Sequence, residues 1–137
     1  MNCIFCNIAK REIEADIVYE DNYSMAFLDI GPANPGHILI ISKEHYKNLD
    51  DVDEIMLAYV TRVVKRVGNA VKKGLGVSGY NVIINNGAVS GQVIDHFHCH
   101  LIPRYDNDGL THWPARDYQA TEAKKLAKKI IANLVNC

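Results

Sequence analysis

Residues 91–102 read GQVIDHFHCHLI, and this stretch decides both the expected fold and the expected chemistry of the chain. Successive side chains of a β-strand alternate between its two faces, so residues two positions apart share a face. One face of such a strand therefore carries His96, His98 and His100, and the other carries Phe97, Cys99 and Leu101. The stretch predicts a strand over residues 95–103 with one chemical face and one core face. We interpret the chemical face as the active site.

Histidines at this spacing are compatible with other interpretations. A His-rich tract also forms metal sites, or lies as polar residues on the solvated face of a sheet. Imidazoles on alternate strand positions can bind a catalytic zinc with an open fourth position, although such sites usually recruit ligands from more than one element. The rest of the chain has to decide between these alternatives.

The bulk composition is that of one ordinary globular domain. The chain has 137 residues, of which 48% are hydrophobic, and a formal net charge of −1. These values provide no basic field for a nucleic-acid backbone and no polybasic patch for a membrane, so any nucleotide partner should be small. No apolar run approaches the length of a membrane span, and the first residues lack the regions of a secretory signal. We therefore expect a cytoplasmic protein with a single domain over residues 1–137.

Hydrophobic periodicity and turn residues place the expected elements. Apolar residues recur at helical spacing after Asp50 or Asp53, either of which can cap a helix, until Gly74 and Gly76 end it. Prolines and glycines interrupt regular structure over residues 31–36. The other expected elements are a helical segment over residues 3–14, strands over residues 17–19, 24–30, 37–41, 80–85 and 95–103, and a helix over residues 121–136.

The order of these elements favours one fold class. Strands that follow one another through tight turns form antiparallel sheets, and here the helices interrupt the strands instead of alternating with each of them. We predict an α+β fold with an antiparallel sheet of about five strands and two main helices. The helices are expected on one face of the sheet, which leaves the other face to bind a ligand.

The histidine tract closely resembles the signature of the histidine triad (HIT) family, in which His-x-His-x-His is followed by two apolar residues. The resemblance covers residues 3–113, with matching segments at residues 28–30, 35–37, 38–41, 43–45 and 91–104. It implies a HIT-like fold, a homodimer, and cleavage at the α-phosphate of a nucleotide through a nucleotidyl-histidine intermediate.

Three histidines are candidates for catalysis. A neutral imidazole is a competent nucleophile toward phosphorus near pH 7, because its ordinary pKa of about 6.5 leaves most of it unprotonated. The resemblance makes His98 the nucleophile and implies that a backbone carbonyl within the triad fixes its tautomer. His100 would contact the phosphate and protonate the leaving group, while His37 faces the site from a neighbouring strand.

The resemblance also places nucleotide-binding residues around these histidines. Many relatives carry Ser or Thr at the position of Val93, so the expected phosphate contact there is the backbone N–H, and the preferred leaving group stays open. The expected phosphate contacts are Asn85, Gly91, Gln92 and Val93, the expected ribose contact is Asp29, and the expected apolar base pocket is Phe5, Ile8, Phe27, Ile30 and Leu39. Burial in the core explains the last five residues equally well.

Cys3 and Cys6 form a CxxC pair. In a reducing cytosol such a pair indicates a metal or a redox centre, and two core cysteines would have the same spacing. By resemblance to zinc-containing HIT proteins and the related galactose-1-phosphate uridylyltransferases, a structural Zn2+ would be held by Cys3, Cys6, His45 and His96. Two thiolates and two imidazoles suit a closed tetrahedral site. His96 would then anchor the strand instead of taking part in catalysis.

The function expected from these residues is that of an enzyme. The expected substrates are a nucleoside phosphoramidate, a nucleoside diphosphate or a dinucleoside polyphosphate, with a purine as the base. One alternative is a nucleotide-binding regulatory module with little turnover, against which the intact His98, His100 and Asn85 argue. The other is a zinc-dependent hydrolase with the metal at the triad, in which chelators would abolish the chemistry directly.

Overall fold

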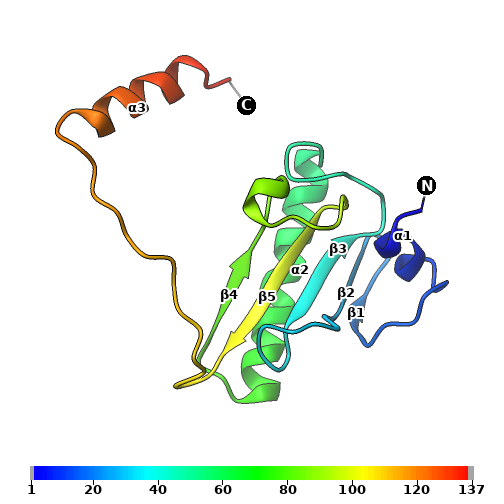
Figure 1. The fold of residues 1–137 in the computed structure, drawn as a ribbon. Helices are drawn as coiled ribbons and strands as arrows, with labels where there is room; N and C mark the ends of the chain where they lie inside the picture. Colours follow the sequence, from blue (N-terminus) through cyan, green and yellow to red (C-terminus); the bar gives the residue numbers. More distant parts are fainter. Residues whose placement is uncertain (1, 136–137) are drawn as a thin grey trace.

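A computed structural model describes residues 2–135. Met1, Asn136 and Cys137 lie outside the described residues, and with them the ends of the predicted domain and of the predicted last helix. The elements in chain order are α1 (Ile4–Ala9), β1 (Ile17–Glu20), β2 (Ser24–Leu28), β3 (Ile38–Ser42), α2 (Glu54–Leu75), β4 (Gly79–Ile83), the short helix η1 (Ala88–Ser90), β5 (His98–Arg104) and α3 (Glu122–Ala132) (Figure 1).

The strands form one five-stranded antiparallel sheet in the order β1-β2-β3-β5-β4. Its central pair, β3 and β5, comes from distant parts of the sequence, and the register sets Leu39 opposite His100 and Ile41 opposite His98. The predicted fold, an antiparallel sheet of about five strands with two main helices, is confirmed.

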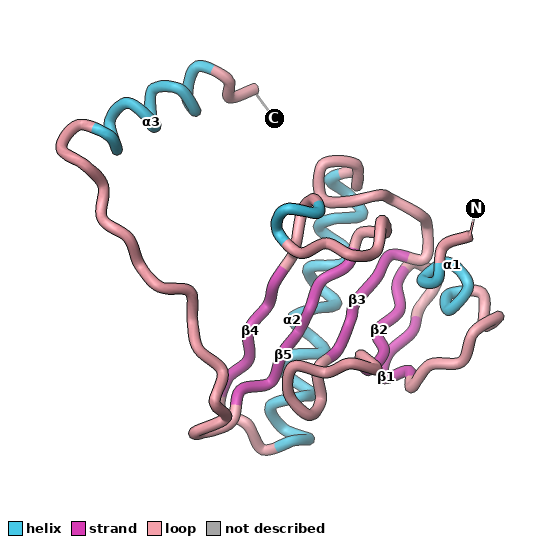
Figure 2. Tube along the Cα trace, viewed as in Figure 1, coloured by secondary structure: helices cyan, strands magenta, loops and turns pink. Residues whose placement is uncertain are grey.

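The long helix α2 covers one face of the sheet (Figure 2). The Asp53 side chain accepts a hydrogen bond from the Met56 N–H at its start, and Gly76 ends it with a left-handed φ of 67°. The buried core between helix and sheet contains Val60, Val63, Val64, Val67 and Val71 of α2 together with Phe97, Cys99 and Leu101. The apolar side of α2 is therefore covered by the sheet of its own chain, and the predicted core face of the histidine stretch is confirmed.

The histidine strand is shorter than predicted, since β5 begins at His98 and not at residue 95. Before it, the His96 N–H bonds the Ile94 carbonyl at 2.8 Å and the Phe97 N–H bonds the Tyr46 carbonyl at 2.6 Å, both outside the sheet ladder. The Phe5 ring nevertheless lies 5.9 Å from the ring of His96 and 5.1 Å from that of His98. These two histidines therefore keep a common side although His96 precedes the strand.

The first helix and β2 also end earlier than predicted. The first helix ends at Ala9 and does not reach residue 14, because Arg11 adopts a left-handed φ of 64° and the chain turns away. β2 ends at Leu28, because the Asp29 carboxylate accepts the Gly31 N–H at 2.8 Å and turns the backbone out of the sheet.

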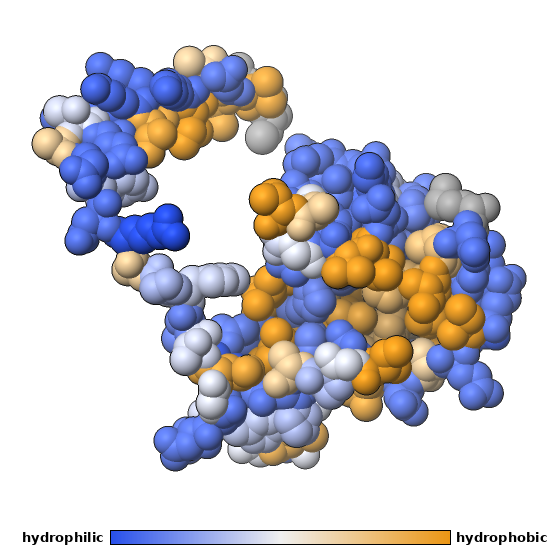
Figure 3. Space-filling model, in the orientation of Figure 1, coloured by the Kyte–Doolittle hydropathy of each residue, from blue (hydrophilic) through white to orange (hydrophobic). Residues whose placement is uncertain are grey.

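α3 does not cover the sheet, so the prediction that both helices lie on one face is wrong for this helix. An extended segment over residues 111–120 carries it away from the domain (Figures 1 and 2). The predicted apolar stripe is present but uncovered, with Ile130 66% and Ile131 68% exposed, and Figure 3 shows apolar side chains along the side of α3 that faces the domain. Within residues 2–135, no helix combines the length and the apolar character needed to span a bilayer.

Candidate active site

His98 is held as one tautomer by a backbone carbonyl. Its Nδ1 lies 2.6 Å from the His96 carbonyl oxygen. A carbonyl only accepts, so Nδ1 carries the proton and Nε2 keeps its lone pair. Burial lowers the pKa of His98 below its ordinary value, against the opposing effects of this hydrogen bond and of the Asp29 carboxylate. The ring is therefore a neutral imidazole with a free nitrogen, which is the form required of a nucleophile.

Hydrogen bonds from Ala33 to His37 and from His37 to His100 fix the tautomers of both rings. The Ala33 N–H donates to His37 Nδ1 at 3.0 Å, so neutral His37 carries its proton on Nε2. That nitrogen lies 3.0 Å from His100 Nδ1, which must accept, and neutral His100 therefore carries its own proton on Nε2. Burial, followed by the proximity of His98 and His37, lowers the pKa of His100 to about 4. At neutral pH His100 is an uncharged N–H donor beside His98, whose ring centroid lies 4.9 Å away.

A pocket of about 340 Å³ opens beside these rings, within the size range of small-molecule sites. Both His98 and His100 line it, whereas His37 is absent from its lining and reaches the site through His100. All five residues expected around the base line it, namely Phe5, Ile8, Phe27, Ile30 and Leu39. Four of them, Phe5, Ile8, Phe27 and Leu39, also belong to a small buried hydrophobic cluster. The same side chains therefore pack in the core and form part of the pocket wall.

The pocket has apolar lining residues that sequence reasoning missed. They are Ile4, Ile13, Ala15, Leu28 and Ile94. Ile13 lies in a segment that was predicted to be helical but follows the end of α1. Its hydrophobic pattern does not indicate that its side chain lines a pocket together with residues of the sheet.

The rim of the pocket carries three more of the expected contacts, Asp29, Gly91 and Val93. One oxygen of Asp29 accepts the Gly31 N–H at 2.8 Å, and the other lies 3.7 Å from His37 Nε2. Val93 is 87% exposed, and its backbone N–H has no hydrogen-bond acceptor within residues 2–135. That N–H is available to a ligand oxygen.

Gln92 and Asn85 are placed differently from these rim residues, since neither lines the pocket. The buried Gln92 amide accepts the Gly87 N–H at 2.8 Å and donates to the carbonyls of Lys47 and Ile94 at 2.8 and 3.0 Å. Its side chain therefore holds the loop after β4 in place. Asn85 is half-buried within that loop, next to Gly91.

The remaining histidine of the triad belongs to a different cluster. The ligand atoms of Cys3, Cys6, His45 and His96 all lie within 4.8 Å of one another. His96 Nε2 donates to the Ser42 carbonyl at 2.7 Å, which leaves Nδ1 unprotonated and 3.4 and 3.5 Å from the Cys3 and Cys6 sulfurs. The Cys6 sulfur lies 3.3 Å from His45 Nδ1.

These distances fit a tetrahedral zinc ion. Zn–S and Zn–N bonds of about 2.3 and 2.0 Å at a tetrahedral angle place S and N about 3.5 Å apart. Among residues 2–135, by contrast, no metal-competent cluster joins the three histidines of the triad, because Nδ1 of His96 faces sulfur and Nδ1 of His98 faces a carbonyl. This arrangement argues against a catalytic zinc on the triad.

Comparison with known proteins places the chain among HIT sequences. The HIT domain family matches residues 10–107. An adenosine 5'-monophosphoramidase of Saccharomyces cerevisiae is 40% identical over 134 residues, covering 96% of this chain and 82% of the yeast protein. An adenylylsulfatase of Arabidopsis thaliana is 36% identical over 136 residues, covering 99% of this chain and 67% of the plant protein.

Solved structures agree with this result. A HIT family protein from Bacillus subtilis superimposes with a TM-score of 0.90 at 33% identity, covering 100% of both chains. A zinc-bound histidine triad family protein from Mycobacterium smegmatis gives a TM-score of 0.78 at 34% identity, covering 96% of this chain and 94% of that one.

Proposed function

The chain belongs to the HIT family, and we propose that it is a nucleotide hydrolase or transferase that cleaves the bond at the α-phosphate of a small purine nucleotide. The observation that carries the proposal is the free Nε2 of His98, presented to the pocket by the hydrogen bond from Nδ1 to the His96 carbonyl. The names of the related yeast and plant enzymes support an adenylyl substrate with a variable leaving group.

In the proposed reaction, the lone pair on His98 Nε2 forms a bond to the α-phosphorus while the bond from phosphorus to the leaving group breaks. The Nε2–H of neutral His100 donates a hydrogen bond to the departing atom, which takes its proton from water, so His100 keeps its own proton. Water then attacks the nucleotidyl-histidine, which restores the imidazole and releases the nucleoside monophosphate. The Val93 N–H and the loop around Asn85 and Gly91 would stabilise negative charge on the phosphoryl oxygens, and Asp29 would accept the ribose hydroxyls.

We further propose that Cys3, Cys6, His45 and His96 bind a structural zinc ion. The support is the fit of their sulfur and nitrogen positions to tetrahedral coordination. The ion would connect the start of α1 to His45, which follows β3, and to His96, which precedes β5. No step of the chemistry passes through it.

Incubation with three substrates tests the proposed activity. We expect release of AMP from an adenosine phosphoramidate, ADP or a diadenosine polyphosphate, because all three present the same α-phosphate to His98 and differ in the leaving group. Product formation is followed by chromatography, and the three values of kcat/KM are compared. Binding of AMP without turnover of any of the three substrates would favour a regulatory nucleotide-binding module instead.

We also propose a homodimer. β4 lies at the end of the sheet order with one unpaired edge, and the apolar stripe of α3 has no cover within residues 2–135. A second copy that pairs along β4 would cover both features.

Light scattering tests this assembly. The wild-type chain is expected to have the mass of two copies at micromolar concentration. The combined change Ile130→Ser and Ile131→Ser is expected to shift the mass toward one copy, because these side chains are exposed in a single chain and gain a partner in the dimer. Lys124→Ser with Lys128→Ser on the same helix is the matched control, and should leave the mass unchanged. A monomeric wild-type protein would contradict the proposal.

A further inference from the structure

The tautomers of His37 and His100 depend on one backbone donor in an irregular loop. The Ala33 N–H lies in residues 31–36, which have no regular secondary structure. Its bond to His37 Nδ1 sets the direction of the hydrogen bond from His37 Nε2 to His100 Nδ1. If this N–H moved away, His37 Nδ1 would be free to carry the proton, and His100 would no longer be constrained to present Nε2–H. The position of the loop is therefore part of the chemistry of the site.

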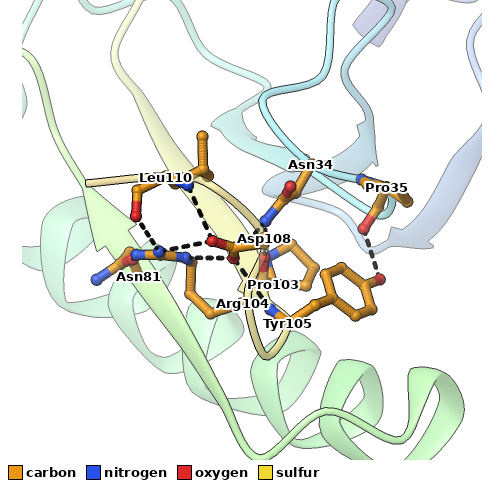
Figure 4. A network of polar contacts seen from close by, with 8 residues as sticks. All are labelled: Asn34, Pro35, Asn81, Pro103, Arg104, Tyr105, Asp108 and Leu110. Atoms are coloured by element: carbon orange, nitrogen blue, oxygen red, sulfur yellow. Dashed lines mark hydrogen bonds and ion pairs between the residues drawn. The ribbon is translucent and has the colours of Figure 1, made fainter. Parts of the chain in front are cut away.

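Asn34 fastens this loop to the end of β5. Its side-chain amide donates to the Pro103 carbonyl at 3.0 Å and to the Asp108 carboxylate at 2.9 Å, and the residue is 8% exposed (Figure 4). Its own carbonyl accepts the His37 N–H at 3.1 Å. Asn34 thus contacts the His37 backbone on one side and the β5 end on the other.

The acceptor for Asn34 is itself held rigidly. The Arg104 guanidinium makes two bonds to the Asp108 carboxylate, at 2.8 and 3.0 Å, and a third to Asn81 Oδ1 at 2.9 Å (Figure 4). The Asp108 side chain is 7% exposed and also accepts the N–H groups of Tyr105 and Leu110. This pairing with Arg104 holds the pKa of Asp108 well below its usual range, so the carboxylate stays charged at neutral pH.

Close packing leaves the loop little room to shift. Gly36 has a left-handed φ of 87°, and a Cβ on it would lie 3.2 Å from Pro103 Cγ and 2.5 Å from Leu75 Cδ1. The loop therefore sits directly on the residue whose carbonyl accepts the Asn34 amide.

We propose that Asn34, held by Asp108 and Arg104, is a positioning residue of the active site that keeps the Ala33 N–H on His37 and thereby fixes His100 as an Nε2–H donor. This inference rests on the proposed function for its catalytic consequence, but the tautomer assignment does not depend on turnover. None of Asn34, Arg104 and Asp108 lines the pocket, so they act through the loop and not on the nucleotide.

Two measurements on Asn34→Ala test the proposal. In nitrogen NMR spectra of histidine-labelled protein, wild-type His37 and His100 should each show a protonated Nε2 and an unprotonated Nδ1 at neutral pH. In the variant the two nitrogen signals of each ring should move toward one another as both tautomers become populated, while His98 keeps its protonated Nδ1. We expect kcat to fall about tenfold, the effect of one lost positioning hydrogen bond, with KM within about twofold.

Tyr105→Phe is the matched control, because the Tyr105 hydroxyl donates to the Pro35 carbonyl of the same loop at 2.8 Å without touching Asn34. It should change neither the spectra nor kcat. Asp108→Asn, which keeps Asn34 but removes the charged acceptor, should move the signals in the same direction and serves if Asn34→Ala does not fold. Unchanged tautomers in Asn34→Ala, or equal losses of kcat in Asn34→Ala and Tyr105→Phe, would overturn the inference. A wild-type protein without turnover but with the expected tautomers would refute the proposed function alone.

Discussion

Replacing His98 with alanine is expected to lower kcat by at least about 10³-fold while nucleotide affinity changes only a few-fold. The His98 side chain supplies a nitrogen, Nε2, that is unprotonated by constraint and belongs to a ring lining the pocket. No neighbouring ring can replace it, since Nδ1 of His100 accepts from His37 and Nδ1 of His96 faces two sulfurs. The measurements are steady-state turnover of an adenosine phosphoramidate and calorimetric binding of AMP.

The control for this variant is His112→Ala, which removes an exposed histidine that does not line the same pocket. It should leave both quantities unchanged. Wild-type protein quenched during turnover should also carry a nucleotidyl group, and His98→Ala should not. Turnover within tenfold of wild type in His98→Ala would remove His98 from the role of nucleophile.

The histidine stretch could be interpreted from sequence because its signal is local. Alternation over residues 96–101 is enough to separate a chemical from a core face, and the buried Phe97, Cys99 and Leu101 confirm that separation. Hydrophobic periodicity likewise predicted α2, because the residues that cap it, Asp53 and Gly76, directly adjoin its two ends in the sequence. The grouping of His45 with His96 required the family resemblance, since nothing local connects them.

The parts that sequence reasoning missed depend on contacts between distant residues or on the backbone. Asn34 meets its acceptors 69 and 74 positions further along the chain, and no pattern in the loop indicates either partner. Ala33 acts through its N–H, a group that every residue except proline has. The position of α3 was mistaken for a related reason, because an amphipathic pattern shows that a helix needs cover but does not show which surface provides it.

Removal of the two cysteines of the proposed zinc site, Cys3 and Cys6, is expected to destabilise the fold strongly. α1 has six residues and no side-chain cap at its start, so it is too short to be stable alone. Cys3 and Cys6 would connect it through the ion to His45 and His96. We expect Cys3→Ala with Cys6→Ala to lose the bound metal and about 3 kcal/mol of unfolding free energy, a fall of about 10 °C in the melting temperature.

The control is Cys99→Ala, which removes another buried sulfur that lies outside the cluster. It should cost about 1 kcal/mol, as expected for a small buried side chain, and keep one equivalent of zinc. Metal content is measured on protein purified without chelator, and stability by thermal and denaturant unfolding. Less than half an equivalent of zinc in the wild-type protein, or equal stability losses in the two variants, would contradict a structural zinc site.

The same cysteine variant separates a structural zinc from a catalytic one. α1 carries Phe5 and Ile8 into the pocket, and the Phe5 ring packs 5.1 Å from that of His98, so a loosened α1 should raise KM for the nucleotide. The free Nε2 of His98 is set by the His96 carbonyl and not by the ion, so kcat measured below the melting temperature should stay within a few-fold of wild type. Loss of kcat in step with loss of metal, with the fold intact, would instead assign the ion to the chemistry.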